Sequence, residues 1–169
     1  SSAASDVYKR QVLFTAPVEK DLEWSDEGIE GSNRFIKRIW KITEENISCI
    51  RDEYEFDFED LSNKNKEFLI KINKTIDKVN YDLDRMQFNT AIASMMELLN
   101  HAYKYKEDNS ADEKLFGFFV YVFIILLNPL IPHLSNELWS KSNFKDKNIN
   151  KLWIKPDKNI LMKDIIKVV

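Results

Sequence analysis

The side chains best suited to bind another molecule are four cations in one short stretch. Arg34, Lys37, Arg38 and Lys41 follow one another at intervals that place them on one face of a helix. Such a face suits the phosphates of a nucleic acid. It could also be a solvated surface with local ion pairs. The residues alone favour this second interpretation.

A second row of cations follows the same spacing further along the chain. Lys71, Lys74 and Lys78 are three and four residues apart, so they share a face of a second predicted helix. Asp77 and Asp82 alternate with them. We therefore expect these lysines to form ion pairs on a solvated face.

Arg85 and Asn89 flank the predicted turn between two helices. The positive end of a helix could meet a phosphate there, with both side chains assisting. Capping of the helix by Asn89 is the interpretation that we favour.

The sequence lacks the residues that cofactor and metal sites usually need. A loop that cradles phosphates needs clustered glycines, and the three glycines of this chain are scattered. A zinc site needs clustered Cys and His, whereas Cys49, His101 and His133 lie far apart. One cysteine excludes an internal disulfide. Because Cys49 lies near Ile47 and Ile50, we expect a small buried thiol. We predict no catalytic, cofactor-binding or metal site.

The remaining reactive or stacking side chains have structural explanations. His133 follows Pro132 without a nearby partner that suggests a catalytic triad, so we expect a packed histidine at a helix start. Trp24, Trp40 and Trp139 could stack on bases. Their spacing among Ile and Leu instead predicts core positions.

These side chains require helices to position them. Few glycines and prolines, with long periodic apolar runs, predict an all-α bundle. The predicted helices are a first from the N-cap Ser25 towards Ile50, followed by Asn65–Leu83, Phe88–Lys106, Ala111–Leu127 and His133–Lys141. We predict a solvated connection over Asp52–Asp60. Gly28 and Gly31 lie early in the first helix, where a glycine is costly, so we expect another segment to pack closely there.

The fourth predicted helix is apolar nearly all round, from Leu115 to Leu127. It is shorter than the roughly 20 apolar residues that span a membrane, and it ends at Asn128-Pro129. We therefore predict the central helix of a bundle and no membrane association.

The ends of the chain differ from its middle. We interpret residues 1–11 as a non-native or artefactual leader and residues 12–24 as a linker that precedes the helical domain. The helical domain is predicted over residues 25–141. Residues 142–169 are predicted to lead into a truncated α/β subdomain, because the β-branched run Ile165–Val169 is typical of a strand. The chain looks cut at both ends.

Three segments, in the same order and spacing, resemble the helical anticodon-binding domain of bacterial leucyl-tRNA synthetases. The first is Asp21–Gly31, continued by Arg34-Phe35 and Arg38-Ile39-Trp40. The second is Phe88–Ala93, with Met96-Glu97-Leu98 and Asn100. The third is Asn128–Leu134, followed by Glu137-Leu138-Trp139. The third motif recurs in valyl and isoleucyl enzymes, whereas the first two point to leucine.

The resemblance implies a fold and a function. The fold would be the anticodon-binding helical bundle of class I aminoacyl-tRNA synthetases, with a short extended start of a β-structure at its C-terminal end. The parent would be a cytoplasmic, monomeric leucine–tRNA ligase that uses ATP with Mg²⁺ and binds tRNA(Leu). The two class I signatures, His-Ile-Gly-His and Lys-Met-Ser-Lys-Ser, are absent, so this part alone would be inactive and would contact the catalytic domain of the same polypeptide.

The resemblance also reweighs the basic residues. For the first helix, it makes phosphate binding and a solvated face about equally well supported. The expected tRNA-binding residues are Arg34, Lys37, Arg38, Lys41, Arg85 and Asn89. Charge reversal at Arg38 and Lys41 is predicted to weaken tRNA binding and to reduce its salt dependence. The alternatives are a stand-alone tRNA-binding or protein-interaction module, and the same domain of a valyl- or isoleucyl-tRNA synthetase.

Overall fold

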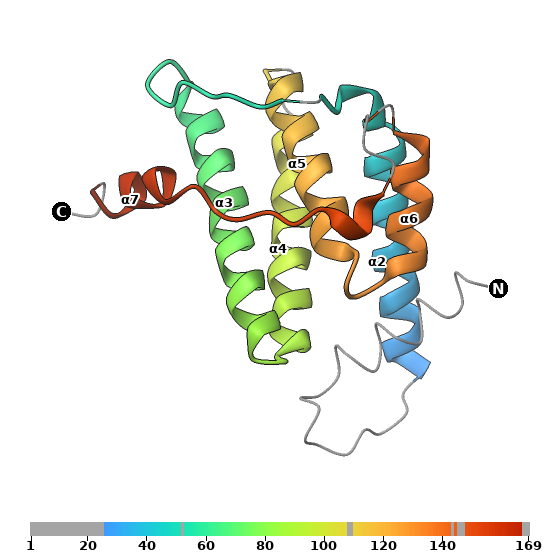
Figure 1. Ribbon diagram of the computed structural model, residues 1–169. Coiled ribbons are helices and arrows are strands. Elements are labelled where there is room, and N and C mark those ends of the chain that lie inside the picture. Colours follow the sequence, from blue (N-terminus) through green and yellow to red (C-terminus); the bar gives the residue numbers. More distant parts are fainter. Residues whose placement is uncertain (1–25, 52, 108–109, 143, 145–147, 167–169) are drawn as a thin grey trace.

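The computed structural model describes residues 26–51, 53–107, 110–142, 144 and 148–166. This part of the chain is helical and contains no strand (Figure 1). Its α-helices are α2 (Asp26–Glu44), α3 (Asn63–Asp84), α4 (Phe88–Glu107), α5 (Glu113–Leu127), α6 (Pro132–Lys141) and α7 (Lys158–Ile166). Two short 3-10 helices, η1 (Ile47–Cys49) and η2 (Ile149–Lys151), join them. The predicted all-α class is confirmed.

The helix boundaries follow local capping chemistry. Ser62 accepts a hydrogen bond from the backbone N–H of Asn65 at the start of α3, and Asp112 accepts one from Leu115 at the start of α5. Between α3 and α4 the chain turns at Met86, whose φ of 58° lies in the left-handed region. The predicted limits of α3, α4, α5 and α6 lie within two residues of those observed.

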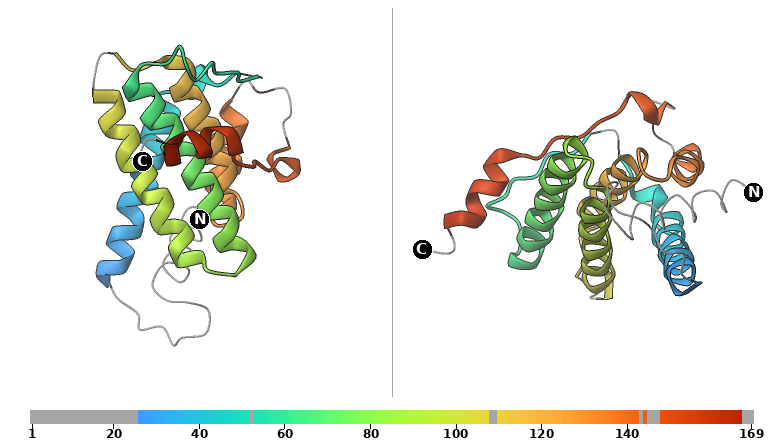
Figure 2. Two further views of the ribbon diagram at one scale, coloured as in Figure 1. Left: turned by 90° about the vertical axis from the view of Figure 1, so that its left-hand side faces the viewer. Right: turned by 90° about the horizontal axis from the view of Figure 1, so that it is seen from below.

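Helix α5 is the centre of the bundle. It packs against α3, α4, α6 and η1, and nearly all of its residues from Leu115 to Leu127 are buried. Figure 2 shows α2, α3, α4 and α6 grouped around it, with α7 on the outer side of α3. The predicted central helix is confirmed. None of the helices described is long and apolar enough to cross a membrane.

The close packing predicted at Gly28 and Gly31 is tested by the structure only at Gly31. A Cβ added at Gly31 would meet nothing within 4 Å, so the prediction is wrong for that residue. A Cβ added at Gly117 in α5 would lie 2.0 Å from the carbonyl oxygen of Cys49. The backbone of η1 therefore rests directly on α5 at Gly117. Cys49 itself is half-buried, so the fully buried cysteine that we expected is not found.

The acidic connection before α3 is only half solvated. Its acids, such as Glu53 and Glu55, are exposed, but the aromatic side chains between them pack inwards. The ring of Tyr54 lies 5.1 Å from that of Phe118, and the ring of Phe56 lies 5.5 Å from it. A strand-like alternation thus lays one side of this segment on α5.

The predicted strand at the C-terminal end is wrong where the structure describes it. Ile165 and Ile166 end helix α7, which packs against α3. An extended strap over 152–157 leads to this helix (Figure 1). Asn80 of α3 donates to the carbonyl of Ile154, and Asn73 accepts from the N–H of Asp157. The leader over 1–11 and the linker over 12–24 lie outside the described residues.

Candidate nucleic-acid interface

The first site is the solvent-facing side of α2. Arg34, Lys37 and Lys41 are exposed there, at intervals of three and four residues. Within the part of the chain that the structure describes, no hydrogen bond or ion pair engages their side chains. We call these three residues the α2 basic face. It presents three cationic side chains to solvent.

Arg38 lies on the same helix but is used differently. Its Nη2 donates to Oδ1 of Asn100 at 2.8 Å, and its guanidinium lies 4.8 Å from the ring centroid of Tyr103. The hydroxyl of Tyr103 in turn donates to the carbonyl of Arg38 at 2.9 Å. Arg38 therefore joins α2 to α4, and its guanidinium is already engaged by a hydrogen bond and a cation–π contact.

Two of the α3 lysines form ion pairs. Lys71 forms an ion pair with Glu97 of α4 at 2.9 Å, and this contact lowers the pKa of the Glu97 carboxyl. Lys78 pairs with Asp82, whose side chain is fully buried. The expected ion pairs are confirmed for these two lysines, although Lys71 pairs with an acid of α4 and the Asp82 carboxylate is buried rather than solvated.

Arg85 and Asn89 lie at the turn between α3 and α4. The exposed Arg85 guanidinium stacks 3.7 Å from the ring centroid of Tyr81. Asn89 is the second residue of α4, so it lies inside the helix rather than at the capping position that we favoured. It precedes Asn100 by eleven residues, about 16 Å along the helix. The structure therefore separates this pair from Arg38.

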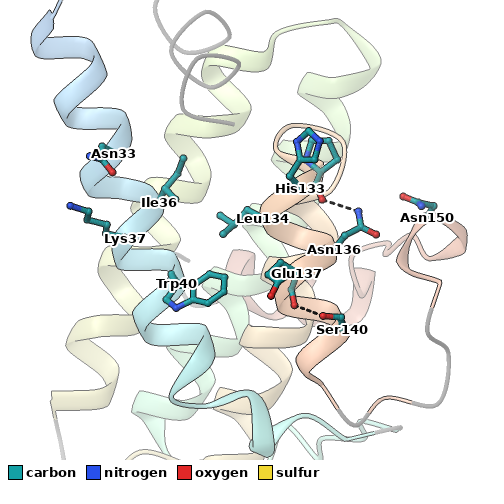
Figure 3. Close-up of a pocket in the computed structure, with 11 residues that line it drawn as sticks. Asn33, Ile36, Lys37, Trp40, His133, Leu134, Asn136, Glu137, Ser140 and Asn150 are labelled. Atoms are coloured by element: carbon teal, nitrogen blue, oxygen red, sulfur yellow. Dashed lines mark hydrogen bonds between the residues drawn. The ribbon is translucent and has the colours of Figure 1, made fainter. Parts of the chain in front are cut away.

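A groove of about 1000 Å³ runs between α2 and α6 (Figure 3). Ile36, Lys37 and Trp40 line it from α2, and His133 and Glu137 line it from α6. The sequence did not predict this groove, because it depends on how two helices far apart in the sequence diverge.

The groove narrows where the two helices are tied together. Lys141 donates to Glu44 at 2.6 Å and lies 4.3 Å from the Trp40 ring centroid. Trp40 Nε1 donates to the same carboxylate at 2.7 Å. The hydrogen bond from Lys141 lowers the pKa of Glu44. Glu44 and Lys141 follow the groove-lining residues along their helices, so this contact lies at one end of the groove.

The other residues considered for chemistry divide between core and surface. Trp139 is fully buried and Trp40 is half-buried, whereas Trp24 lies outside the described residues. His133 is at the start of α6 as predicted, but its side chain is exposed rather than packed. Among the residues described, no group of three His, Cys, Asp or Glu side chains is placed to hold a metal ion.

Known proteins are similar to this chain in sequence and in fold. The family model described as "Anticodon-binding domain of tRNA ligase" matches residues 65–169. The chain is 39% identical over 168 residues to a leucine–tRNA ligase of Brachyspira hyodysenteriae, covering 98% of this chain and 20% of that protein. It is 35% identical over 165 residues to one of Fusobacterium nucleatum, covering 95% and 19%. The chain thus spans about one fifth of the length of these relatives.

Two solved structures share the fold. One is the ternary complex of Agrobacterium radiobacter K84 agnB2 LeuRS, tRNA and LeuAMS, with a TM-score of 0.81 and 24% identity; the match covers 93% of this chain and 20% of that one. The other is the free state of Mycobacterium tuberculosis methionyl-tRNA synthetase, with a TM-score of 0.60 and 16% identity, covering 83% and 34%. Because the family model matches more than half of the sequence, the chain belongs to the anticodon-binding domain family of tRNA ligases.

Proposed function

We propose that this chain is the tRNA-binding helical domain of a leucine–tRNA ligase and that its α2 basic face contacts the phosphates of tRNA(Leu). The identity to leucine–tRNA ligases over nearly the whole chain supports the choice of leucine. The observation that carries the proposed contact is the exposure of Arg34, Lys37 and Lys41 without partners among the described residues.

Electrostatics explains why this face suits tRNA. Side chains cannot read base edges in the deep, narrow major groove of paired RNA, so a protein recognises it mainly by shape, phosphates and 2′-hydroxyls. The exposed cations of the α2 basic face are available to a phosphate, whereas Lys71 and Lys78 are already paired with acids. Arg85 and Asn89 form a second, separate contact at the α3–α4 turn in this proposal.

The proposal assigns catalysis to other parts of the parent enzyme. That enzyme would form leucyl-adenylate from leucine and ATP with Mg²⁺, and would then transfer the leucyl group to the end of the tRNA. The described residues do not fit ATP or Mg²⁺, because they contain neither a glycine-rich loop nor a cluster of acids placed for a metal. The partner of this domain would be the catalytic domain of the same cytoplasmic, monomeric polypeptide.

Salt dependence of tRNA binding tests the phosphate contacts. Affinity of the chain for a tRNA(Leu) transcript is measured from about 50 to 200 mM salt. Lys37→Glu and Lys41→Glu should each weaken binding and lower the slope of log affinity against log salt by about one. Lys155→Glu makes the same charge change on the strap beside α3, so it should leave the slope near that of the parent. Equal slopes for all three variants would exclude the proposed face.

A further inference from the structure

A small hollow between α3 and α4 lies apart from the surfaces described above. The start of α3 and the end of α4 lie side by side there (Figure 1), and the hydroxyl of Tyr105 donates to Oδ1 of Asn65 at 2.8 Å. The hollow has a volume of about 190 Å³. Because this volume is below the range for drug-sized ligands, the hollow suits a small ion or one group of a larger ligand.

The base of the hollow is built from packed aromatic side chains. Phe68 of α3 and Tyr105 of α4 line the hollow, and both are buried. Their rings stack with centroids 4.2 Å apart. This packing fixes the depth of the hollow, so polar groups around its rim can meet a ligand at a defined place.

Basic side chains line the hollow from both helices. Lys64 belongs to α3, whereas His101 and Lys104 belong to α4. The ammonium group of Lys64 donates to the carbonyl of Tyr105 at 3.0 Å and lies 4.7 Å from the centroid of its ring. These contacts hold one positive charge against the base of the hollow. His101 and Lys104 are exposed, so their side chains can turn towards a ligand.

The cations outweigh the acids around His101. Burial lowers the pKa of its imidazole, and the ammonium groups of Lys71 and Lys104 lower it further, whereas Glu97 acts in the opposite direction. Glu97 is itself paired with Lys71 at 2.9 Å. Glu67 also lines the hollow, but it is exposed, so its carboxylate can turn into solvent. The electrostatic potential in the hollow is therefore positive, which favours an anion.

We propose that this hollow binds a phosphate group through Lys104 and His101, with the positive charge of Lys64 beneath it. The oxygens of a phosphate accept from several donors at once, and the ammonium and imidazole groups supply these donors from two helices. A carboxylate has fewer oxygens and would use this arrangement less fully. The phosphate can be a free ion or a unit of an RNA backbone. The second source rests on the proposed tRNA-binding function, whereas the first does not.

Nuclear magnetic resonance of the imidazole ring protons tests the site with inorganic phosphate as the probe. Phosphate replaces chloride in a solution of the 169-residue chain at constant pH and ionic strength. The resonances of His101 should shift saturably, whereas those of His133 on α6 should not. Lys104→Gln should weaken the apparent affinity about tenfold, the loss expected for one charge-assisted hydrogen bond. Lys155→Gln removes the same charge from the strap beside α3 and should leave the affinity near that of the parent.

Brief acetylation of the chain distinguishes the two sources of the phosphate. Modification of Lys104 is quantified by mass spectrometry with inorganic phosphate and with a tRNA(Leu) transcript. Protection by both identifies an RNA backbone as the occupant, whereas protection by phosphate but not by bound tRNA identifies a free ion. If the chain binds no tRNA, the proposed function fails while the phosphate result still stands. Absence of a saturable His101 shift with phosphate, or equal affinities of Lys104→Gln and the parent, would overturn the proposal.

Discussion

Arg38 illustrates how one residue of a basic row acquires a different role from its neighbours. Its guanidinium hydrogen-bonds to Asn100, 62 residues away, and stacks on Tyr103. The spacing of cations along α2 places Arg38 on a face but carries no information about a partner on another helix. For that reason the sequence could not separate Arg38 from Lys37 and Lys41.

Two substitutions should separate these roles. Arg38→Gln should lower the free energy of unfolding by about 1 kcal/mol, because the contacts with Asn100 and Tyr103 are lost. It should change the salt slope of tRNA binding little. Lys41→Gln should do the reverse, lowering the slope while leaving urea unfolding unchanged. If Arg38→Gln lowered the slope as much as Lys41→Gln does, Arg38 would belong to the phosphate-binding face.

Tyr54 gives a prediction for alkaline pH. Burial raises the pKa of its hydroxyl to about 12, above the ordinary value of 10.0. The unfolded chain therefore loses this proton at lower pH than the folded one, and stability falls as pH rises from about 10 towards 12. Tyr54→Phe removes the group, so its loss of stability between about pH 9 and 11.5 should be smaller than that of the parent. Identical losses in urea unfolding would show that Tyr54 is solvated.

At the scale of the elements, the sequence predicts what local patterns determine. The apolar period of Phe68, Ile72, Ile76 and Val79 places α3, and all four side chains are buried. The aromatic residues Tyr54 and Phe56 were missed because the acids between them suggest a solvated connection. Their alternation was the available signal. The divergence of α2 and α6 leaves no local signal, because it depends on the packing of both helices within the bundle.

Gly117 and Gly31 make a matched pair for testing the packing of α5. Gly117→Ala would place a methyl group 2.0 Å from the carbonyl oxygen of Cys49, so η1 must move. The expected net loss is at least about 1 kcal/mol in the free energy of unfolding, despite the better helix propensity of Ala. Gly31→Ala meets nothing within 4 Å and should raise stability by up to about 1 kcal/mol. Similar effects of both substitutions would contradict the close contact at Gly117.

At the scale of the whole molecule, the chain combines a net charge of −3 with a local surface of opposite sign. The acids are concentrated in the connection before α3, whereas the α2 basic face lies on a helix. Separation of this kind allows a protein with a negative net charge to bind a polyanion through one face. Packing of α2 against α4 and α6 holds the three cations on one helix of the bundle.

Lysine reactivity tests this arrangement most directly. The chain is acetylated briefly with and without saturating tRNA(Leu), and modification of each lysine is quantified by mass spectrometry. The proposed interface predicts several-fold protection of Lys37 and Lys41, with Lys71, Lys78 and Lys155 unchanged. Protection of the α3 lysines with Lys37 and Lys41 still reactive, while tRNA is bound, would contradict the assignment of the tRNA-binding face to α2.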